Sequence, residues 1–183
     1  MTRSCIALVG ALALAAGCAV GGNSERDPGS DTAGDPGGGA PITTDADSYT
    51  LAPPSGPATL SIVATYTNDT DQVVFIEPCG GGAPFSLQKQ VDGQWQLAYS
   101  PICPMILVPP LEIAAGESYT DTLEIREPRE ANVAPSFSVA PIAGTYRLVY
   151  SIYGTWTGDT PGAGLGEQLS EERRVSNEFE VRE

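Results

Sequence analysis

The sequence predicts an antiparallel β-sandwich, and three observations support this fold class. Several runs rich in β-branched residues alternate between apolar and polar side chains, as strands with one buried face do. Residues that favour turns, among them many of the 21 glycines and 16 prolines, separate these runs. No segment shows a convincing helical period of 3.6 residues. We therefore expect one all-β domain of about seven to nine strands.

The run ATLSIVATYTN (58–68) shows the alternation most clearly, because its even-numbered residues from Leu60 to Tyr66 fall on one face. The cluster NDTD (68–71) then predicts a turn, since Asn and Asp side chains bond the nearby backbone. The segments FSLQKQV (85–91) and QWQLAYS (94–100) predict a hairpin around an Asp-Gly turn. The remaining strands are expected in QVVFIEP (72–78), LEIAAGESYTDTLEIRE (111–127), GTYRLVYSIYGTW (144–156) and RRVSNEFEVRE (173–183).

The apolar residues of these runs define the expected core. It comprises Leu60, Ile62, Val74, Phe85, Leu87, Trp95, Leu97, Leu123, Ile125, Tyr146, Leu148, Tyr150 and Phe179.

Tyr146 lies just inside a late strand, in AGTYRLVY (143–150), after a glycine and a small residue. This arrangement looks like the tyrosine corner of immunoglobulin-like sandwiches, in which the hydroxyl holds the preceding corner. A tyrosine that merely favours strand structure is the alternative interpretation. With the strand count, the pattern favours an immunoglobulin-like antiparallel β-sandwich over residues 48–183.

The first 17 residues have the pattern of a secretory signal peptide. Arg3 supplies the positive start, residues 5–16 form an apolar stretch, and Ala16 and Gly17 are small residues suited to a cleavage site. The apolar stretch is too short to span a bilayer as a helix. We therefore expect export from the cytoplasm.

The segment Leu14-Ala15-Ala16-Gly17-Cys18 resembles the lipobox of bacterial lipoproteins. The resemblance implies a diacylglycerol on Cys18, cleavage before it and usually acylation of the new amine. More than one acyl chain is the physical requirement for lasting attachment, because one chain binds only marginally. The expected partner is thus the membrane, through a lipid anchor on Cys18. In diderm members of this family, Ala19 in place of Asp implies the outer membrane.

Residues 18–47 read as a tether between this anchor and the domain. They are rich in Gly, Asp, Pro and Ser and contain almost no large apolar side chain. Such a segment cannot offset its ordering entropy by burial, so we expect a disordered linker.

The composition narrows the function classes. The chain has 9 basic and 23 acidic side chains, a net charge of −14, and loss of Arg3 with the signal peptide would leave a charge near −15. Such a chain repels nucleic acid, which we exclude as a partner. Histidine is absent, so Ser-His-Asp and Cys-His catalysis are impossible. We expect no cofactor and no metal; a calcium site at NDTD (68–71) is the weaker alternative to a plain turn.

The two cysteines of the domain, Cys79 and Cys103, are expected to form a disulfide. Cys5 lies in the signal peptide and Cys18 carries lipid, so only these two remain outside the cytoplasm, where disulfides persist. The bond would join CGGGAP (79–84) to SPICP (100–104) and hold a group of apolar residues nearby. Either those residues pack in the core, which we favour, or they form a contact surface. They are Ile102, Met105, Ile106, Leu107 and Val108.

The order of YTNDTDQVVF, FSLQKQVDGQW, IAAGESYTDTLEI and GTYRLVY, over roughly residues 58–152, is similar to the bacterial intracellular proteinase inhibitor family named for a Bacillus protein. The resemblance implies an immunoglobulin-like fold. This chain departs from the family in its export signal, its cysteine pair and the stretch SPICPMILVPP (100–110).

Three functional hypotheses follow. The leading one is a membrane-anchored lipoprotein whose domain binds an unknown envelope protein or ligand without catalysis. The second is a protease inhibitor that inserts an exposed loop such as 100–110 into a protease cleft. The third is a hydrolase based on paired carboxylates, with Asp69, Asp71 and Glu77 as candidates.

Overall fold

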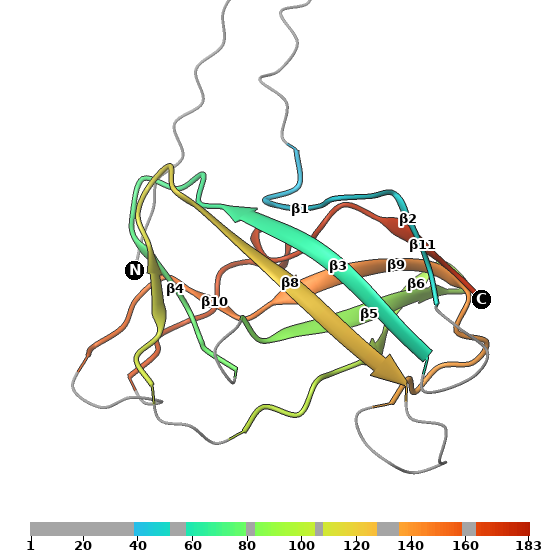
Figure 1. Ribbon diagram of the computed structural model, residues 1–183. Helices are drawn as coiled ribbons and strands as arrows, with labels where there is room; N and C mark the ends of the chain where they lie inside the picture. The colour runs from blue at the N-terminus through green and yellow to red at the C-terminus, as the bar shows by residue number, and fades with distance from the viewer. Residues whose placement is uncertain (1–38, 52–57, 80–82, 105–107, 128–135, 159–163) are drawn as a thin grey trace, which may run out of the picture. The chain divides into compact units, whose positions relative to one another are not determined.

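The computed structural model describes residues 39–51, 58–79, 83–104, 108–127, 136–158 and 164–183 (Figure 1). The chain divides into a unit of residues 1–36 and a unit of residues 37–183. The first unit lies outside the described residues, as do the predicted signal peptide, Cys18 and most of the predicted linker.

This unit is an all-β sandwich, as predicted. Its strands are β1 (Ile42–Thr44), β2 (Ser48–Thr50), β3 (Ala58–Thr67), β4 (Val74–Ile76), β5 (Phe85–Val91), β6 (Gln94–Tyr99), β7 (Leu111–Ile113), β8 (Ser118–Glu127), β9 (Gly144–Tyr150), β10 (Ile152–Tyr153) and β11 (Phe179–Arg182). A short 3-10 helix, η1 (Glu171–Arg173), precedes the last strand.

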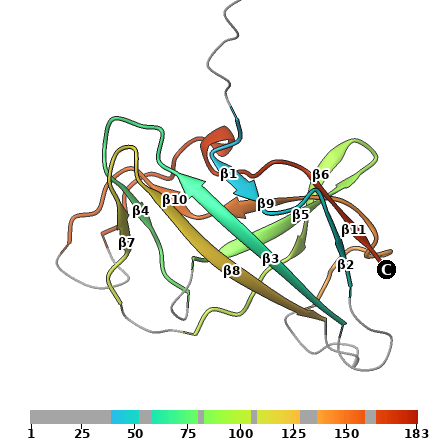
Figure 2. The same cartoon turned by 45° about the horizontal axis from the view of Figure 1, so that its top comes forward.

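The strands form three sheets, with the orders β1-β3-β8, β2-β11-β9-β5-β6 and β10-β4-β7. All pairings of these named strands are antiparallel except that of β2 with β11. In Figures 1 and 2, β3 and β8 cross over β5 and β9, so these two sheets are the layers of the sandwich.

β3 and β8 are the longest pair, matched over ten residues from Ala58 opposite Glu127 to Thr67 opposite Ser118. Beyond two turns, β4 and β7 continue the same chain directions and pair from Val74 opposite Ile113. β4 also pairs with β10, which follows β9 of the five-stranded sheet. The small sheet therefore joins strands that continue from both layers.

The core prediction is correct for ten of its thirteen residues, which are almost completely buried. Phe85 and Trp95 are only partly buried, and Trp95 stacks on the Arg147 guanidinium, whose carbon lies 4.5 Å from the ring centroid. The prediction for Leu97 is wrong, because this side chain is 56% exposed.

A β-bulge explains the exposure of Leu97. Leu87 lies opposite Tyr99, but the next residue, Gln88, lies opposite Leu97, which leaves Ala98 as an extra residue in β6. Ala98 and Tyr99 are both buried. Since an extra residue switches the face of everything beyond it, the simple alternation assigns Leu97 to the wrong side.

Strand structure begins before residue 48, the predicted start of the domain. Ile42 is fully buried and pairs with Tyr66 as the first residue of β1. The Asp45 carboxylate then accepts hydrogen bonds from the Tyr49 hydroxyl and the Val63 amide. The β-branched stretch Ile42–Thr44 thus forms a strand because it pairs with β3. Its local composition does not indicate this pairing.

The Tyr146 hydroxyl donates a hydrogen bond to the Ile142 carbonyl at 2.5 Å. This is the backbone contact that a tyrosine corner makes. The Lys89 side chain packs beside this corner and is buried, with only 6% of its surface exposed. Its ammonium group lies 5.9 Å from the Tyr146 ring centroid and donates to the Pro141 carbonyl.

Gly144 makes room for the Lys89 side chain. Its φ is +146°, and a Cβ added there would lie 2.7 Å from Lys89 Cε. Gly116 also has a positive φ, +77°, but a Cβ there would meet nothing within 4 Å. A side chain at either position would therefore strain the backbone, whereas only a side chain at residue 144 would also overlap with Lys89.

We predict that Gly144→Ala lowers the free energy of unfolding by more than Gly116→Ala does. Gly116→Ala should cost about 1 kcal/mol for the backbone conformation alone, and the overlap with Lys89 should add about 1–3 kcal/mol for Gly144→Ala. Urea midpoints at equal m-values measure both. Equal losses would contradict a fixed position of the Lys89 side chain against residue 144.

Candidate functional site

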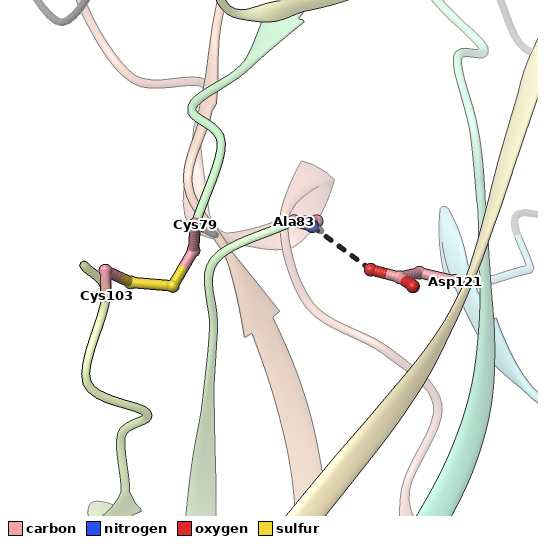
Figure 3. The surroundings of a disulfide bond; sticks show 4 residues. All are labelled: Cys79, Ala83, Cys103 and Asp121. Carbon is pink, nitrogen blue, oxygen red and sulfur yellow. Dashed lines mark hydrogen bonds between the residues drawn. A yellow bond between two sulfur atoms is a disulfide. The ribbon is translucent and has the colours of Figure 1, made fainter. Parts of the chain in front are cut away.

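The disulfide between Cys79 and Cys103 is present, as predicted (Figure 3). Cys79 follows β4 and Cys103 follows β6, and the two Cα atoms are 4.9 Å apart. The bond therefore holds together two loops that leave different sheets. We call residues 77–79 and 101–104 the stapled loops.

Asp121 of β8 approaches the chain that follows Cys79. One of its carboxylate oxygens accepts a hydrogen bond from the Ala83 amide at 3.1 Å (Figure 3). The other oxygen accepts from the amide of Thr122 at 2.8 Å. This carboxylate thus links β8 to the chain just beyond the disulfide.

Two hollows lie next to this contact, and Ala83 lines both. The first has a volume of about 340 Å³ and the second of about 380 Å³. The first is lined by Ile76, Pro78, Ala83, Val108, Pro109, Pro110, Leu111 and Tyr119, and the second by Cys79, Ala83, Phe85, Pro101, Ile102, Pro104, Asp121, Thr122 and Leu123. We call the two hollows together the β8 groove. Its walls are mostly apolar and rich in proline.

Ile102 stands in the stapled loops with 63% of its surface exposed. The core interpretation of the apolar residues near the disulfide is therefore wrong for Ile102, because Pro101 and the disulfide hold its loop at the surface. Val108 is half-buried and lines the first hollow. Met105, Ile106 and Leu107 lie outside the described residues.

Two tyrosines surround the Asp121 carboxylate. Burial, with the Asp121 charge as a smaller cause, raises the pKa of Tyr119 to about 12. Burial and the same charge also raise the pKa of Tyr150. Tyr150 is 1% exposed, and its hydroxyl has no hydrogen-bond partner among the described residues. Both phenols thus stay neutral at physiological pH.

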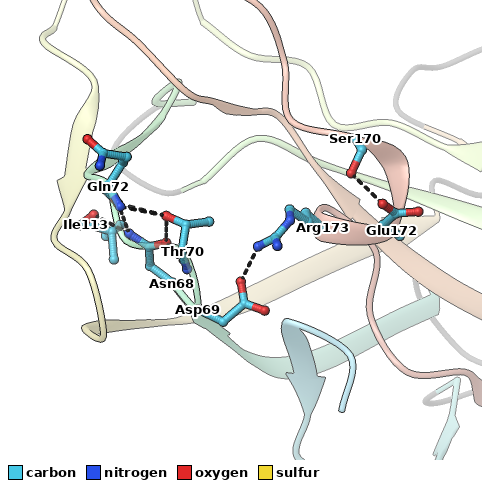
Figure 4. Close-up of polar contacts among 8 residues, drawn as sticks. All are labelled: Asn68, Asp69, Thr70, Gln72, Ile113, Ser170, Glu172 and Arg173. Carbon is cyan, nitrogen blue, oxygen red and sulfur yellow. Dashed lines mark hydrogen bonds and ion pairs between the residues drawn. The ribbon is translucent and has the colours of Figure 1, made fainter. Parts of the chain in front are cut away.

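The NDTD segment is a turn built around Asn68 (Figure 4). The buried Asn68 amide donates to the carbonyls of Gln72 and Ile113, and its oxygen accepts from the Thr70 amide and hydroxyl. The Asn68 side chain therefore connects this turn to the strand β7, as the plain-turn interpretation expects.

Asp69 of the same turn forms an ion pair with Arg173 of η1 at 2.7 Å (Figure 4). The hydroxyl of Ser170, just before η1, donates to Glu172. Asp69 thus already has a cationic partner. Within the described residues, no group of three or more His, Cys, Asp or Glu side chains could hold a metal ion.

The carboxylates proposed for a hydrolase lie in different settings. Asp69 pairs with Arg173, and Glu77 accepts a hydrogen bond of 3.4 Å from the Tyr153 hydroxyl. Asp71 is exposed in the turn. Asp121, which sequence reasoning passed over, is the carboxylate that lines a hollow. Its position on the inner, otherwise apolar face of β8 is the one sequence signal that could have found it.

No helix in the described part of the chain is long and apolar enough to cross a membrane.

No protein-family model matches the chain, and no curated protein matches it. Among solved structures it is similar to the Pseudomonas fluorescens alkylpurine DNA glycosylase AlkC bound to DNA containing an abasic site analog, at 11% identity and a TM-score of 0.30, over 78% of this chain and 29% of that one. It is also similar to the Listeria innocua β-glucosidase with gluconolactone, at 17% identity and a TM-score of 0.30, over 78% of this chain and 16% of that one. The chain spans less than a third of these proteins, and such scores carry no argument about activity.

We predict opposite effects of removing two buried hydroxyls. Tyr150→Phe should leave stability unchanged or raise it by about 1 kcal/mol, because it deletes a buried hydroxyl that lacks a partner. Tyr146→Phe should lower it by about 1 kcal/mol, because it deletes the bond to Ile142. Chemical denaturation of both variants measures the difference. A loss in Tyr150→Phe as large as that in Tyr146→Phe would reveal a bonded Tyr150 hydroxyl.

Proposed function

We propose that this chain is a bacterial lipoprotein, anchored in the cell envelope through Cys18, whose β-sandwich binds a partner through its stapled loops. Binding, and not catalysis, is the activity of the domain. The partner is an envelope protein or ligand, and in a diderm bacterium the anchor lies in the outer membrane.

The anchor rests on the segment LAAGC at residues 14–18 and on the apolar stretch before it. The disulfide between Cys79 and Cys103 supports this location, because such bonds persist outside the cytoplasm. The Gly- and Asp-rich segment after Cys18 supports a tether that holds the domain away from the bilayer.

The single observation that carries the binding role is the exposed Ile102 in the stapled loops. Its side chain is 63% exposed between Pro101 and the disulfide-bonded Cys103. An apolar group fixed at the surface by a staple and a proline loses little conformational entropy on binding, which favours affinity. The neighbouring hollows offer concave, mostly apolar walls for the same partner.

We predict that cells given radiolabelled palmitate incorporate the label into the full-length protein and not into Cys18→Ala. The lipid is expected on the Cys18 thiol and on the amine released by cleavage. Substitution of Cys18 therefore removes both attachment points. Cys5→Ala is the matched control and should keep the label. Label retained by Cys18→Ala would contradict the anchor.

We predict that Ile102→Asp abolishes capture of the envelope partner by the tethered protein in its own cells. A charge at this position would have to be desolvated in the complex. Val73→Asp is the matched control, because Val73 is 39% exposed but does not line either hollow. Crosslinking followed by mass spectrometry measures capture. Equal capture by both variants would remove Ile102 from the binding surface.

A second candidate function is inhibition of an extracytoplasmic protease, as the family resemblance implies. The specific observation in its favour is again the rigid, exposed segment Pro101–Pro104, which has the preorganisation that an inhibitory loop needs. Inhibition of secreted proteases that is lost in Ile102→Asp would favour this function over attachment to an envelope component.

A further inference from the structure

Among the described residues, β8 is an edge strand that has no partner strand on its outer side. It stands last in the order β1-β3-β8, and within the described residues it pairs with β3 alone. The pairing extends over all ten residues of the strand. Long edge strands present a row of backbone donors and acceptors that another chain can pair with.

The hydrogen bonds between β1 and β3 show which backbone groups of β3 point toward β8. The Thr67 amide donates to the Pro41 carbonyl, and the Val63 carbonyl accepts from the Asp45 amide, both on the β1 side. The N–H and C=O groups of successive residues point to opposite edges of a strand. The backbone groups of the even-numbered residues of β3 therefore point toward β8.

The same alternation decides which residues of β8 face outward. Tyr119, Asp121, Leu123 and Ile125 lie opposite the even-numbered residues of β3. The backbone groups of Thr120, Thr122, Glu124 and Arg126 therefore point away from β3. The Thr122 amide agrees with this direction, because its acceptor is the Asp121 side chain and not a strand.

This free edge borders the β8 groove. Tyr119 lines the first hollow, and Asp121 and Leu123 line the second. Successive residues of the same face along a strand are roughly 7 Å apart. A strand added beside β8 can thus place one inward side chain in each hollow, on the two sides of Ala83.

We propose that the β8 groove binds an extended peptide segment of a partner protein, which adds to β8 as a further strand. The segment carries apolar side chains at alternate positions and a lysine or arginine near Asp121. This inference rests on the proposed binding function and names its mode, in which backbone pairing supplies affinity and pockets for alternate side chains supply specificity.

The charge of the groove selects a basic segment. Among the described residues that line the two hollows, Asp121 is the carboxylate, and none is a lysine or arginine. The neighbours of Asp121 among the described residues are neutral: the amides of Ala83 and Thr122 donate to it, and the Tyr119 hydroxyl lies beside it. The whole chain carries a net charge of −14, which attracts a basic segment from a distance.

The test is selection of random heptapeptides, displayed on phage, against the full-length protein in detergent. We expect enriched peptides with alternating apolar residues and one lysine or arginine. A synthetic copy of the best peptide should bind Thr120→Pro at least tenfold more weakly than the wild type, because proline removes an outward amide and leaves the pairing with β3 intact. Thr120→Val, which keeps the amide, should bind within twofold of the wild type.

Two measurements keep the test valid if Thr120→Pro does not fold. N-methylation of the peptide at alternate residues should abolish binding for one set of positions and spare it for the other, because only one edge of the peptide pairs with β8. Asp121→Asn should weaken the basic peptide about tenfold and leave a norleucine-substituted copy unchanged.

Several results would overturn the inference. The first is a lack of enrichment over a selection without protein, and the second is equal affinity of the two N-methylated peptides. The third is self-association that is lost in Thr120→Pro, which would make a second copy the occupant. Peptides that lose affinity in Ile102→Asp but tolerate both methylation patterns would refute strand addition while supporting the proposed binding function.

Discussion

The Cys79–Cys103 disulfide is the constraint on which the arrangement of the site depends. It ties the loop after β4 to the loop after β6, strands that belong to different sheets. With a separation of 24 residues, the loop-entropy account assigns it about 3.5 kcal/mol of stabilisation. More important for function, it holds Ile102 at the surface and places proline-rich walls opposite the edge of β8. Without this disulfide, the proposed partner would have to order both loops at the cost of binding energy.

Much of the fold could be predicted from the sequence because a strand with one buried face alternates between apolar and polar residues. The alternation from Leu60 to Tyr66 indicates β3, and the Asp-Gly turn indicates the hairpin of β5 and β6. Two features of the fold could not be predicted from local sequence patterns. The bulge that exposes Leu97 depends on how β6 pairs with β5, and β1 forms because Ile42 reaches Tyr66 across the chain. Both are consequences of pairing over a distance.

The candidate site, like the fold, could be predicted only in part. The pairing of Cys79 with Cys103 could be predicted by assigning Cys5 to the expected signal peptide and Cys18 to the expected lipid anchor. The corner at Tyr146 was one of two interpretations of a short motif around Gly144. The free edge of β8 was beyond reach, because period-two patterning indicates a strand but not its place in the sheet order. The role of Asp121 could be inferred only from its contact with Ala83 and its place in the wall of the second hollow.

The central claim, that β8 has an open edge beside the groove, is tested most directly by amide hydrogen exchange in the free full-length protein, followed by NMR. The account predicts alternation along one strand: slow exchange at Tyr119, Leu123 and Ile125, and fast exchange at Thr120 and Glu124, whose amides point outward. Uniform slow exchange from residue 119 to residue 125 would contradict the account, because it would mean that another segment already pairs with this edge.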